Sequence, residues 1–323
     1  MTLRPELLTP EFRALSARLG QDPLQVQGPG GNTSIKDDEV MWIKASGTEL
    51  ADAETKDIFV AVDRKAALAE AREEAGDGSC KETVLDPRVT LRPSIETTFH
   101  AALPWAVVAH THSVATIVHV ISPEGRDVVM DKLADLKPVL VPYAKPGLPL
   151  TAEILARVAP ETQVILLQNH GLICCGESVE DVSNLIAEVE TRLGLQSAAV
   201  EAAIQTKAPD EFGWSGASWL ARDERACALA QSGTYYPDHV VFLGPALPIE
   251  DHAEEPPVVL QPGTGVLIRN AATSSQMAMI QCLHDVLARL PSEWTVEPIG
   301  PAAEAELLNW DAEKYRQALA ARG

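Results

Sequence analysis

Three histidines stand out as residues whose type and spacing could do chemistry, and two of them are one residue apart. His110 and His112 follow the short apolar run at residues 106–109, which predicts a buried strand. In an extended segment, residues i and i+2 point to the same face, so the two imidazoles can meet one ligand. Two interpretations stay open at this point: a shared divalent metal ion, or two unrelated histidines at the end of a strand.

The third histidine follows a second apolar run. His170 comes after residues 164–167 and precedes Gly171, so it too is predicted at the end of a strand, where functional sites gather in α/β folds. Taken alone, His170 is better interpreted as a hydrogen-bonded structural histidine. Three histidines at two comparable strand ends instead predict a metal centre, because three neutral imidazoles leave the fourth position of zinc open for a substrate. We therefore expect one Zn²⁺, or another divalent ion, per chain.

Glu96 is the candidate acid/base group beside this centre. It lies near the predicted start of a helix, where the helix dipole stabilises a carboxylate, so a plain role in capping the helix is the alternative. His100 lies on the same helical face as Glu96 and could orient it. A structural histidine with its own partner is the better interpretation of His100.

Residues 28–34, with the sequence GPGGNTS, form a glycine-rich loop. Such a loop offers backbone N–H groups and positive φ angles to an anion such as phosphate. It lacks the Gly-Lys-Ser/Thr ending of a P-loop, and it is not the GxGxxG fingerprint of dinucleotide-binding folds. Since glycine-rich turns are common, a plain turn is the alternative interpretation.

The elements that must position these groups alternate between helix and strand as far as residue 205. Thr9 is predicted to cap a first helix that begins at Pro10, and Ser94 to cap a helix that begins at Ile95. Further helices are predicted at residues 64–75, 151–158 and 178–193, and strands at residues 40–44, 106–109, 139–142 and 164–167. This alternation indicates an α/β fold.

The remaining residues predict a second, smaller α/β unit. Residues 206–218 are expected to be a linker, followed by helices at 219–231, 274–290 and 303–321 and by strands at 240–243, 258–260 and 266–269. We therefore predict two domains, a catalytic one at residues 1–205 and a C-terminal α/β extension at residues 206–323. The role of the extension stays open between oligomerisation, substrate selection and no part in catalysis.

Composition narrows the class of function. The chain has 323 residues, of which 46% are hydrophobic, enough for a full core. Its formal net charge of −20 argues against nucleic acid and against a membrane surface as partners, because both require a basic face. The five cysteines lack CxxC spacing, and we find neither a signal peptide nor a run long enough to span a membrane. We therefore expect reduced thiols and a cytoplasmic protein.

Five motifs occur in an order that resembles the class II aldolase/adducin family. They are GGNTS (30–34), KASGT (44–48), the stretch from Ser94 to Glu96, AHTHS (109–113) and QNHGL (168–172). The likeness covers about residues 8–205, and the motifs are most similar to those of the rhamnulose- and fuculose-phosphate aldolase branch. The resemblance implies a three-layer α/β/α domain that assembles as a homotetramer with the active site between subunits.

The resemblance also implies roles for individual residues. The zinc ligands would be His110, His112 and His170, and Glu96 would be the acid/base group. The substrate phosphate would be held by Gly31, Asn32, Ser46, Gly47 and Ser94. In the family a neighbouring subunit supplies a catalytic tyrosine. Tyr143 is a candidate for this role, and a tyrosine in the core or at an interface is the alternative.

The sequence departs from the family pattern at two phosphate donors. Pro29 stands where the aldolases often carry a hydroxyl residue, and Ile95 stands where they often carry serine. Either a nearby cation compensates for these donors, or the substrate is not a phosphate ester. The candidate cations are Arg92, Lys36 and Lys44.

The activity that the resemblance implies is aldol cleavage of a ketose, with a ketose 1-phosphate as the expected substrate. Zinc would act as a Lewis acid and stabilise the enediolate that forms when the carbon–carbon bond breaks, and Glu96 would move the proton. A 4-epimerase or a dehydratase would use the same groups, so both stay open. A third alternative is a non-catalytic, adducin-like interaction module, which would need neither Glu96 nor the three histidines at these spacings.

Overall fold

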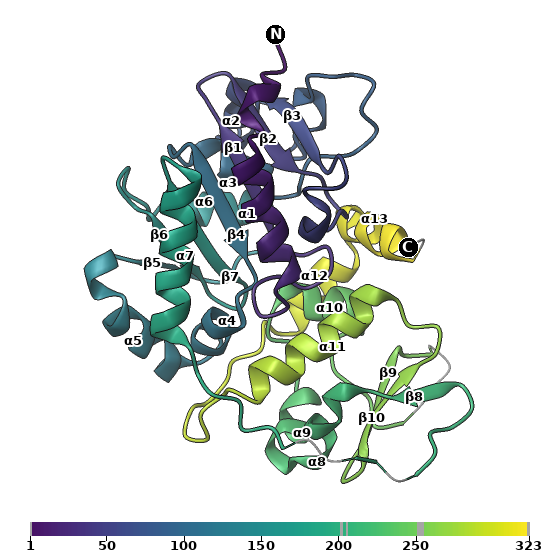
Figure 1. The fold of residues 1–323 in the computed structure, drawn as a ribbon. Helices are drawn as coiled ribbons and strands as arrows, with labels where there is room; N and C mark the ends of the chain where they lie inside the picture. Colours follow the sequence, from purple (N-terminus) through teal and green to yellow (C-terminus); the bar gives the residue numbers. More distant parts are fainter. Residues whose placement is uncertain (1, 201–202, 205, 251–254, 322–323) are drawn as a thin grey trace.

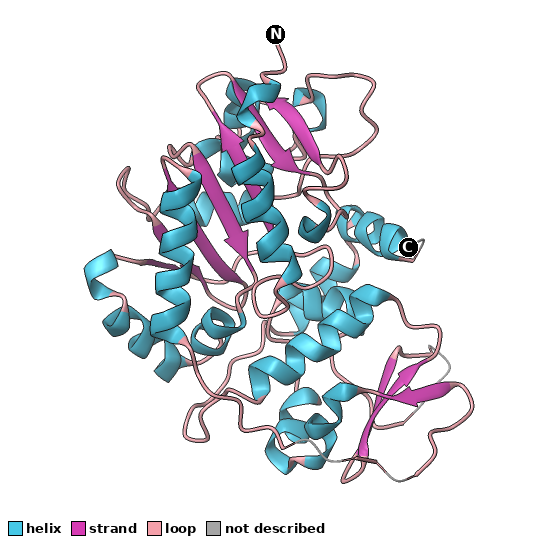
Figure 2. Ribbon diagram, viewed as in Figure 1, coloured by secondary structure: helices cyan, strands magenta, loops and turns pink. Residues whose placement is uncertain are grey.

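Two β-sheets organise the computed structural model, which describes residues 2–200, 203–204, 206–250 and 255–321 (Figures 1 and 2). The strands of the larger sheet are β1 (Asn32–Lys36), β2 (Val40–Lys44), β3 (Phe59–Asp63), β4 (Val107–Thr111), β5 (Val139–Val141), β6 (Val164–Leu167) and β7 (Gly171–Gly176). They lie in the order β3-β2-β1-β4-β7-β6-β5, and only β5 and β6 are parallel neighbours. The strand that carries His110, β4, is therefore central and is held on both sides.

Helices cover both faces of this sheet and confirm the predicted three-layer α/β/α arrangement. Helices α1 (Pro10–Gln21) and α7 (Val179–Leu193) pack side by side on one face (Figure 1), and α4 (Val114–Val120) and α5 (Pro123–Lys132) join the same core. Helices α2 (Arg64–Ala71), α3 (Thr97–Ala102) and α6 (Leu148–Leu155) cover the other face. Side chains of β4 alternate between the two cores, as its pleat requires: Val107 and Ala109 face one, and Val108 faces the other.

Local signals at the helix starts explain where the long helices begin. Thr9 accepts a hydrogen bond from the backbone N–H of Phe12 at the start of α1, which confirms the predicted cap. Ser178 and Asp181 form a reciprocal capping box at the start of α7. These two helices lie over the sheet that presents the histidines.

The C-terminal region, defined here as residues 206–323, holds the smaller sheet and the remaining helices. Its antiparallel strands are β8 (Phe212–Trp214), β9 (Val258–Gln261) and β10 (Gly265–Arg269), in the order β8-β10-β9. Its helices are α8 (Trp219–Arg222), α9 (Glu224–Ala230), α10 (Pro237–Leu243), α11 (Ser274–Leu287), α12 (Pro301–Leu308) and α13 (Asp311–Ala320).

Two contacts join the C-terminal region closely to the rest of the chain. Val240 of α10 and Leu283 of α11 belong to one apolar cluster with Ile117 of α4. The last helix, α13, returns to the first part of the chain (Figure 1). There Leu319 lies against the turn at Gly47. The C-terminal region therefore forms part of the surroundings of the KASGT motif.

The prediction of a strand at residues 240–243 was wrong, because this segment is the second half of helix α10. Pro237 occupies the first turn of the helix, after the extended residue Tyr236, and this start was not recognised. Every residue of α10 is buried, so its apolar run shows no periodicity that distinguishes helix from strand.

Smaller corrections concern the element boundaries. The predicted linker at 206–218 contains the edge strand β8, and the helices predicted at 219–231 and 303–321 are each broken into two. Helix α3 begins at Thr97, with Glu96 as its N-cap residue, whereas Ser94 lies in the preceding turn. The loop predicted at residues 28–34 ends at Gly31, because Asn32 already pairs with His110 in β1 and β4.

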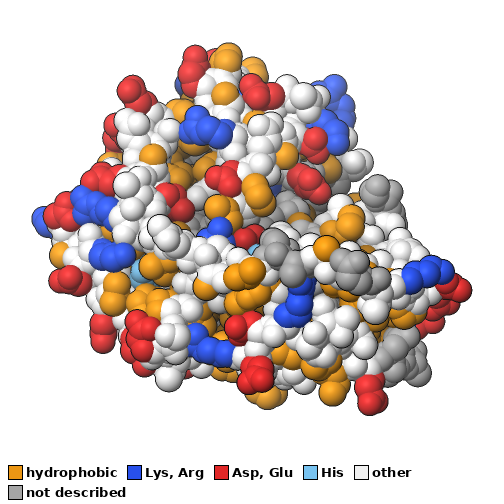
Figure 3. Space-filling view, turned by 60° about the horizontal axis from the view of Figure 1, so that its bottom comes forward, with side chains coloured by type: hydrophobic (Ala, Val, Ile, Leu, Met, Phe, Trp, Pro, Cys, Tyr) orange, Lys and Arg blue, Asp and Glu red, His pale blue; other side chains and the backbone are white. Residues whose placement is uncertain are grey.

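No described helix is both long and apolar enough to cross a membrane. On the face shown in Figure 3, acidic and basic side chains of the described residues are interspersed, without one continuous basic patch. This face offers no basic surface of the kind that nucleic acid requires.

Candidate metal centre and active site

Three neighbouring strands bring the predicted histidines together. His110 is in β4, His112 follows that strand directly, and His170 lies in the turn between β6 and β7. Because β7 pairs with both β4 and β6, the turn lies beside the end of β4. One nitrogen from each ring lies within 4.8 Å of the other two, and the side chains are at most 6% exposed. The structure therefore brings together all three predicted ligands.

The hydrogen bonding and the charge of the three histidines suit ligands of a divalent metal ion. Nδ1 of His110 lies 3.0 Å from the carbonyl oxygen of Leu172, which can accept its hydrogen, while Nε2 is buried and without a partner among the described residues. A carbonyl bound to the far nitrogen is the usual support for a metal-binding histidine. Burial lowers the pKa values of His112 and His170 to about 3, so both rings are neutral at physiological pH, as ligation requires.

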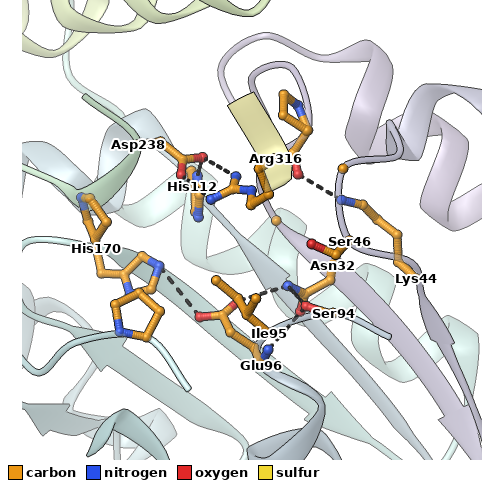
Figure 4. Close-up of a pocket in the computed structure, with 15 residues that line it drawn as sticks. Asn32, Lys44, Ser46, Ser94, Ile95, Glu96, His112, His170, Asp238 and Arg316 are labelled. Carbon is orange, nitrogen blue, oxygen red and sulfur yellow. Dashed lines mark hydrogen bonds and ion pairs between the residues drawn. The ribbon is translucent and has the colours of Figure 1, made fainter. Parts of the chain in front are cut away.

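Glu96 faces this cluster from the start of α3 (Figure 4). Its two carboxylate oxygens lie 3.5 Å from Nε2 of His110 and 3.6 Å from Nε2 of His170. Burial opposes its ionisation, but the two rings and the Asn32 amide outweigh burial and hold its pKa below the usual value for glutamate. Glu96 is thus a buried carboxylate that faces the histidine cluster.

Asn32 orients this carboxylate through its side-chain amide. The amide nitrogen donates to Glu96 at 2.7 Å and to the Ser94 hydroxyl at 3.1 Å. The amide oxygen lies 2.5 Å from Nε2 of His100, whose other nitrogen lies 2.7 Å from the Ser34 hydroxyl. His100 is therefore the partnered structural histidine that the sequence favoured, and it supports Glu96 indirectly by fixing Asn32.

The residues predicted to bind substrate line one small cavity together with Glu96, His112 and His170. They are Gly31, Asn32, Ser46, Gly47 and Ser94. The cavity has a volume of about 20 Å³, roughly the room that one water molecule needs. A second cavity of about 670 Å³ shares Ser46, Ile95 and Pro146 with it and extends along α13. The candidate metal centre therefore lies at a small cavity, beside a space that is large enough for a sugar.

The three cations considered as replacements for the missing phosphate donors lie in three different places. Lys44 lines the small cavity, where Nζ donates to the carbonyl of Pro29 at 2.8 Å and burial lowers its pKa to about 7. Arg92 lines the larger cavity, with its guanidinium 4.1 Å above the ring centre of Tyr315. Lys36 lines neither cavity, and its buried Nζ has no partner among the described residues.

Two charged residues of the C-terminal region complete the pocket, and the sequence analysis did not single them out. Asp238 of α10 places Oδ2 at 3.4 Å from Nδ1 of His112, and Arg316 of α13 donates to both oxygens of Asp238 at 2.8 and 3.0 Å (Figure 4). Burial alone would raise the pKa of Asp238, but the Arg316 guanidinium outweighs it and holds that pKa below its usual range. One signal was available, since Asp238 is a lone carboxylate within an otherwise apolar segment.

Close packing explains one glycine of the GPGGNTS loop. A Cβ atom at Gly30 would lie 2.7 Å from Nδ1 of His112 and 2.9 Å from Oδ2 of Asp238. Any side chain at this position would therefore push into the contact between the histidine and the carboxylate. The glycine links the N-terminal loop to the C-terminal region across the candidate metal centre.

The remaining candidates lie outside the two cavities. Tyr143 lines neither of them, and burial raises the pKa of its phenol above the usual value. All five cysteines are buried and unpaired, as expected for reduced thiols.

Comparison with known proteins agrees with this geometry. The sequence profile of the Class II Aldolase and Adducin N-terminal domain matches residues 12–197. The L-fuculose phosphate aldolase of Haemophilus influenzae is 32% identical over 173 residues, which are 51% of this chain and 70% of that protein. The "Uncharacterized oxidoreductase YuxG" of Bacillus subtilis is 33% identical over 178 residues, half of this chain and 25% of that protein.

Two further relatives show how varied the similar proteins are. A 3-oxo-tetronate 4-phosphate decarboxylase of Escherichia coli is 35% identical over 114 residues, 31% of this chain and 52% of that protein. The chain thus spans a quarter to about half the length of these first curated relatives. Among solved structures, the N-terminal class II aldolase domain of a conserved protein from Thermoplasma acidophilum matches with a TM-score of 0.51 and 26% identity, covering 60% of this chain and 94% of that chain.

The matched residues, 12–197, contain the three histidines, Glu96 and Asn32, whereas Asp238 and Arg316 lie beyond them. A profile match over more than half of the chain, together with the fold and the ordered motifs, leads to one conclusion. This chain belongs to the class II aldolase/adducin family.

Proposed function

We propose that this protein is a zinc-dependent lyase that performs aldol cleavage of a ketose, with a ketose 1-phosphate as the expected substrate. The observation that carries the proposal is the position of Glu96, a buried carboxylate 3.5–3.6 Å from two of three clustered histidines. A non-catalytic interaction module would gain nothing from holding an acid against a metal-binding cluster in a closed pocket. Family membership and the relatives named as aldolases support a lyase.

Each of the clustered residues has its own role in the proposed reaction. His110, His112 and His170 would hold the ion, which when bound supplies a Lewis acid that stabilises negative charge on the carbonyl side of the breaking bond. Glu96 would give and take the proton at the carbon next to that carbonyl. Asn32 fixes the Glu96 carboxylate through its amide, so the acid/base group does not have to be ordered during the reaction.

Substrate binding would use the lining of the two cavities. In the small cavity the reacting carbons would lie beside Glu96, and Asn32, Ser46 and Ser94 with Gly31 and Gly47 would hold the phosphate. The rest of the sugar would extend into the larger cavity. Because the small cavity has room for about one water molecule, its wall must yield when a substrate binds. Helix α13 lines both cavities. The homotetramer implied by the family resemblance stays a prediction, to be checked by sedimentation.

The first test is the metal content of the purified protein, measured by elemental analysis. We expect about one zinc or similar divalent ion per chain in the wild type and its loss in the variants His110→Ala and His170→Ala. His119→Ala is the matched control, because His119 is buried in α4 away from the cluster. A wild-type protein that contains no metal and takes up no added zinc would overturn the proposal.

The second test separates the reactions that the same residues could perform. Ketose phosphates, free ketoses and sugar acids are incubated with the metal-loaded protein, and the products are identified by NMR. Aldol cleavage yields two carbonyl compounds, an epimerase yields one isomer, and a dehydratase yields a product lacking water. Full metal occupancy without turnover on any of these compounds would favour the interaction module.

A further inference from the structure

A buried row of charged groups connects the C-terminal region to the metal centre. His112 faces Asp238 of α10, Asp238 accepts from both terminal nitrogens of Arg316, and Nη1 of Arg316 also donates to Glu313 at 2.9 and 3.1 Å. Each of these side chains is at most 8% exposed. Arg316 lines the small cavity together with Glu96, His112 and His170 (Figure 4).

The hydrogen bonds of Arg316 leave one edge of its guanidinium unused. The group carries five N–H bonds in a rigid fork. Asp238 takes one hydrogen from each terminal nitrogen, and Glu313 takes the second hydrogen of Nη1. The hydrogens that remain are those of Nε and one of Nη2, which point the same way. Nε has no partner among the described residues and is not sealed off from solvent.

The orientation of this edge is fixed before any ligand binds. Asp238 and Glu313 hold two sides of the guanidinium, and the ring of Phe242 lies against it, with its centre 5.6 Å from the guanidinium carbon. A planar fork held in this way loses little conformational freedom when it binds a carboxylate or a phosphate through two parallel hydrogen bonds.

Charge makes this edge the favourable place for an anion. The chain carries a formal net charge of −20, so an anionic substrate needs a local cation against the overall field. The other cation of the small cavity is Lys44, whose Nζ is already bound to the Pro29 carbonyl. Arginine keeps its charge in a buried site, where lysine readily loses it.

We propose that Arg316 is the anion receptor of the active site, and that its Nε/Nη2 edge binds one oxyanion group of the substrate, a carboxylate or a phosphate. Asp238 and Glu313 are positioning residues for this edge. The proposal deepens the proposed function, because it defines the substrate as an anion and makes the C-terminal region part of the active site of its own chain. The anion site itself does not depend on the metal.

Binding of inorganic phosphate and of acetate to the metal-free protein tests the proposal, with calorimetry as the measurement. We expect the wild type to bind at least one of the two, and the preferred probe identifies the type of oxyanion. Arg316→Lys keeps a positive charge between the two carboxylates but lacks the fork, so its binding should be at least about tenfold weaker. Arg192→Lys is the matched control and should bind as the wild type does, because Arg192 is also held by two carboxylates, Asp135 and Glu188, and lines neither cavity.

A second variant covers the case in which Arg316→Lys does not fold. The triple variant Asp238→Asn/Glu313→Gln/Arg316→Gln removes all three members of the buried ion-pair network, so it leaves no uncompensated charge there. Its binding of phosphate or acetate should be lost as well. The proposal is overturned if the wild type binds neither anion, or if Arg192→Lys weakens binding and Arg316→Lys does not. Metal content and cleavage of neutral ketoses are measured separately, so failure of the anion site is distinguishable from failure of the lyase assignment.

Discussion

The two parts of this chain contribute to the candidate active site in different ways. The part matched by the family profile supplies the three histidines, Glu96 and Asn32, each within a short motif. The C-terminal region supplies Asp238 and Arg316, which are 78 residues apart in the sequence and meet only in the folded chain. Asn169, in the His170 turn, also donates to the backbone carbonyls of Tyr235 and Glu297. The candidate catalytic and metal-binding residues can thus be recognised from short sequence motifs, whereas the residues that support them can be recognised only in the folded chain.

The two parts of the chain also differ in how their buried cations are paired. Lys36 of β1 is 3% exposed, and its ammonium has no partner among the described residues. Arg316 of α13 is 7% exposed and is held by two carboxylates. A buried charge without a partner costs stability, whereas a paired one becomes costly only when its partner is removed.

The largest effect is expected at Glu96. Glu96→Gln keeps the shape of the side chain and removes its ability to accept a proton, so the turnover number should fall by about 10²–10⁴-fold. The metal content should stay at the wild-type level, because the three histidines are untouched. Both quantities are measured on the same preparation, once a substrate has been identified.

Glu304→Gln is the control for this substitution. Glu304 is another buried glutamate, which accepts hydrogen bonds from the backbone N–H and the hydroxyl of Thr234, and neither residue lines either cavity. The Glu304→Gln variant should retain its turnover even if its stability falls. Full activity of Glu96→Gln would show that the acid/base assignment is wrong.

Lys36, the unpaired cation in the part of the chain that the family profile matches, is expected to lower the stability of the protein. Burial lowers the pKa of Lys36 from 10.5 to about 7, so protonation is penalised in the folded state. Since one pKa unit corresponds to about 1.4 kcal/mol, Lys36→Met should raise the free energy of unfolding by roughly 3–5 kcal/mol at pH 6.5. Urea unfolding measures the difference, and Lys65→Met, at an exposed position, should show almost none.

The pH dependence of this gain identifies its cause. Below about pH 7 Lys36 is protonated in both the folded and the unfolded protein, so the penalty is complete. Between pH 7 and 10.5 only the unfolded protein binds the proton, and the stability of the wild type rises with pH relative to the variant. The advantage of Lys36→Met should therefore shrink as the pH rises from 7 to 9.5. An advantage that does not change with pH would point to packing instead of charge.

Removing a paired charge in the C-terminal region should lower the free energy of unfolding, whereas removing the unpaired charge of Lys36 should raise it. Asp238→Asn removes the carboxylate that faces His112, so the affinity for zinc should fall by about 10–100-fold. The free energy of unfolding should fall by about 1.5–3 kcal/mol, because Arg316 loses its hydrogen bonds to Asp238 but keeps Glu313. Asp285→Asn, which breaks an ion pair with Arg289 of the same region, should leave zinc affinity unchanged. Equal zinc affinities of Asp238→Asn and Asp285→Asn would show that the Asp238 carboxylate does not influence the metal centre.

The sequence was sufficient for the parts of the site that depend on neighbours in sequence. Strand periodicity places His110 and His112 on one side of β4, and the apolar run before His170 ends in the turn that brings this third histidine alongside. These relations follow from local geometry, whereas the three-layer arrangement was expected from the family resemblance. The exact start of α3 was missed by two residues, because the turn after Pro93 positions Glu96 before the helix begins.

Other features were beyond sequence reasoning for a physical reason. Helix α10 is buried on all sides, so its apolar run carries no helical periodicity, and a strand was predicted in its place. The pairing of Asp238 with Arg316 depends on how α13 returns across the molecule. The role of Gly30 depends on that same packing, because it is defined by atoms of His112 and Asp238.

Gly30 connects the two parts of the chain and should show the smallest effect of the four sites. In Gly30→Ala the added Cβ would push His112 and Asp238 apart, so the zinc affinity should fall severalfold, less than in Asp238→Asn. If both substitutions act on one contact, their effects should not add, and the double variant should bind zinc about as weakly as Asp238→Asn alone. Gly213→Ala in β8, where a Cβ meets no atom closer than 3.9 Å, should leave zinc affinity unchanged. Additive losses in the double variant would show that Gly30 and Asp238 influence the metal centre independently, and that the N-terminal loop needs its glycine for another reason.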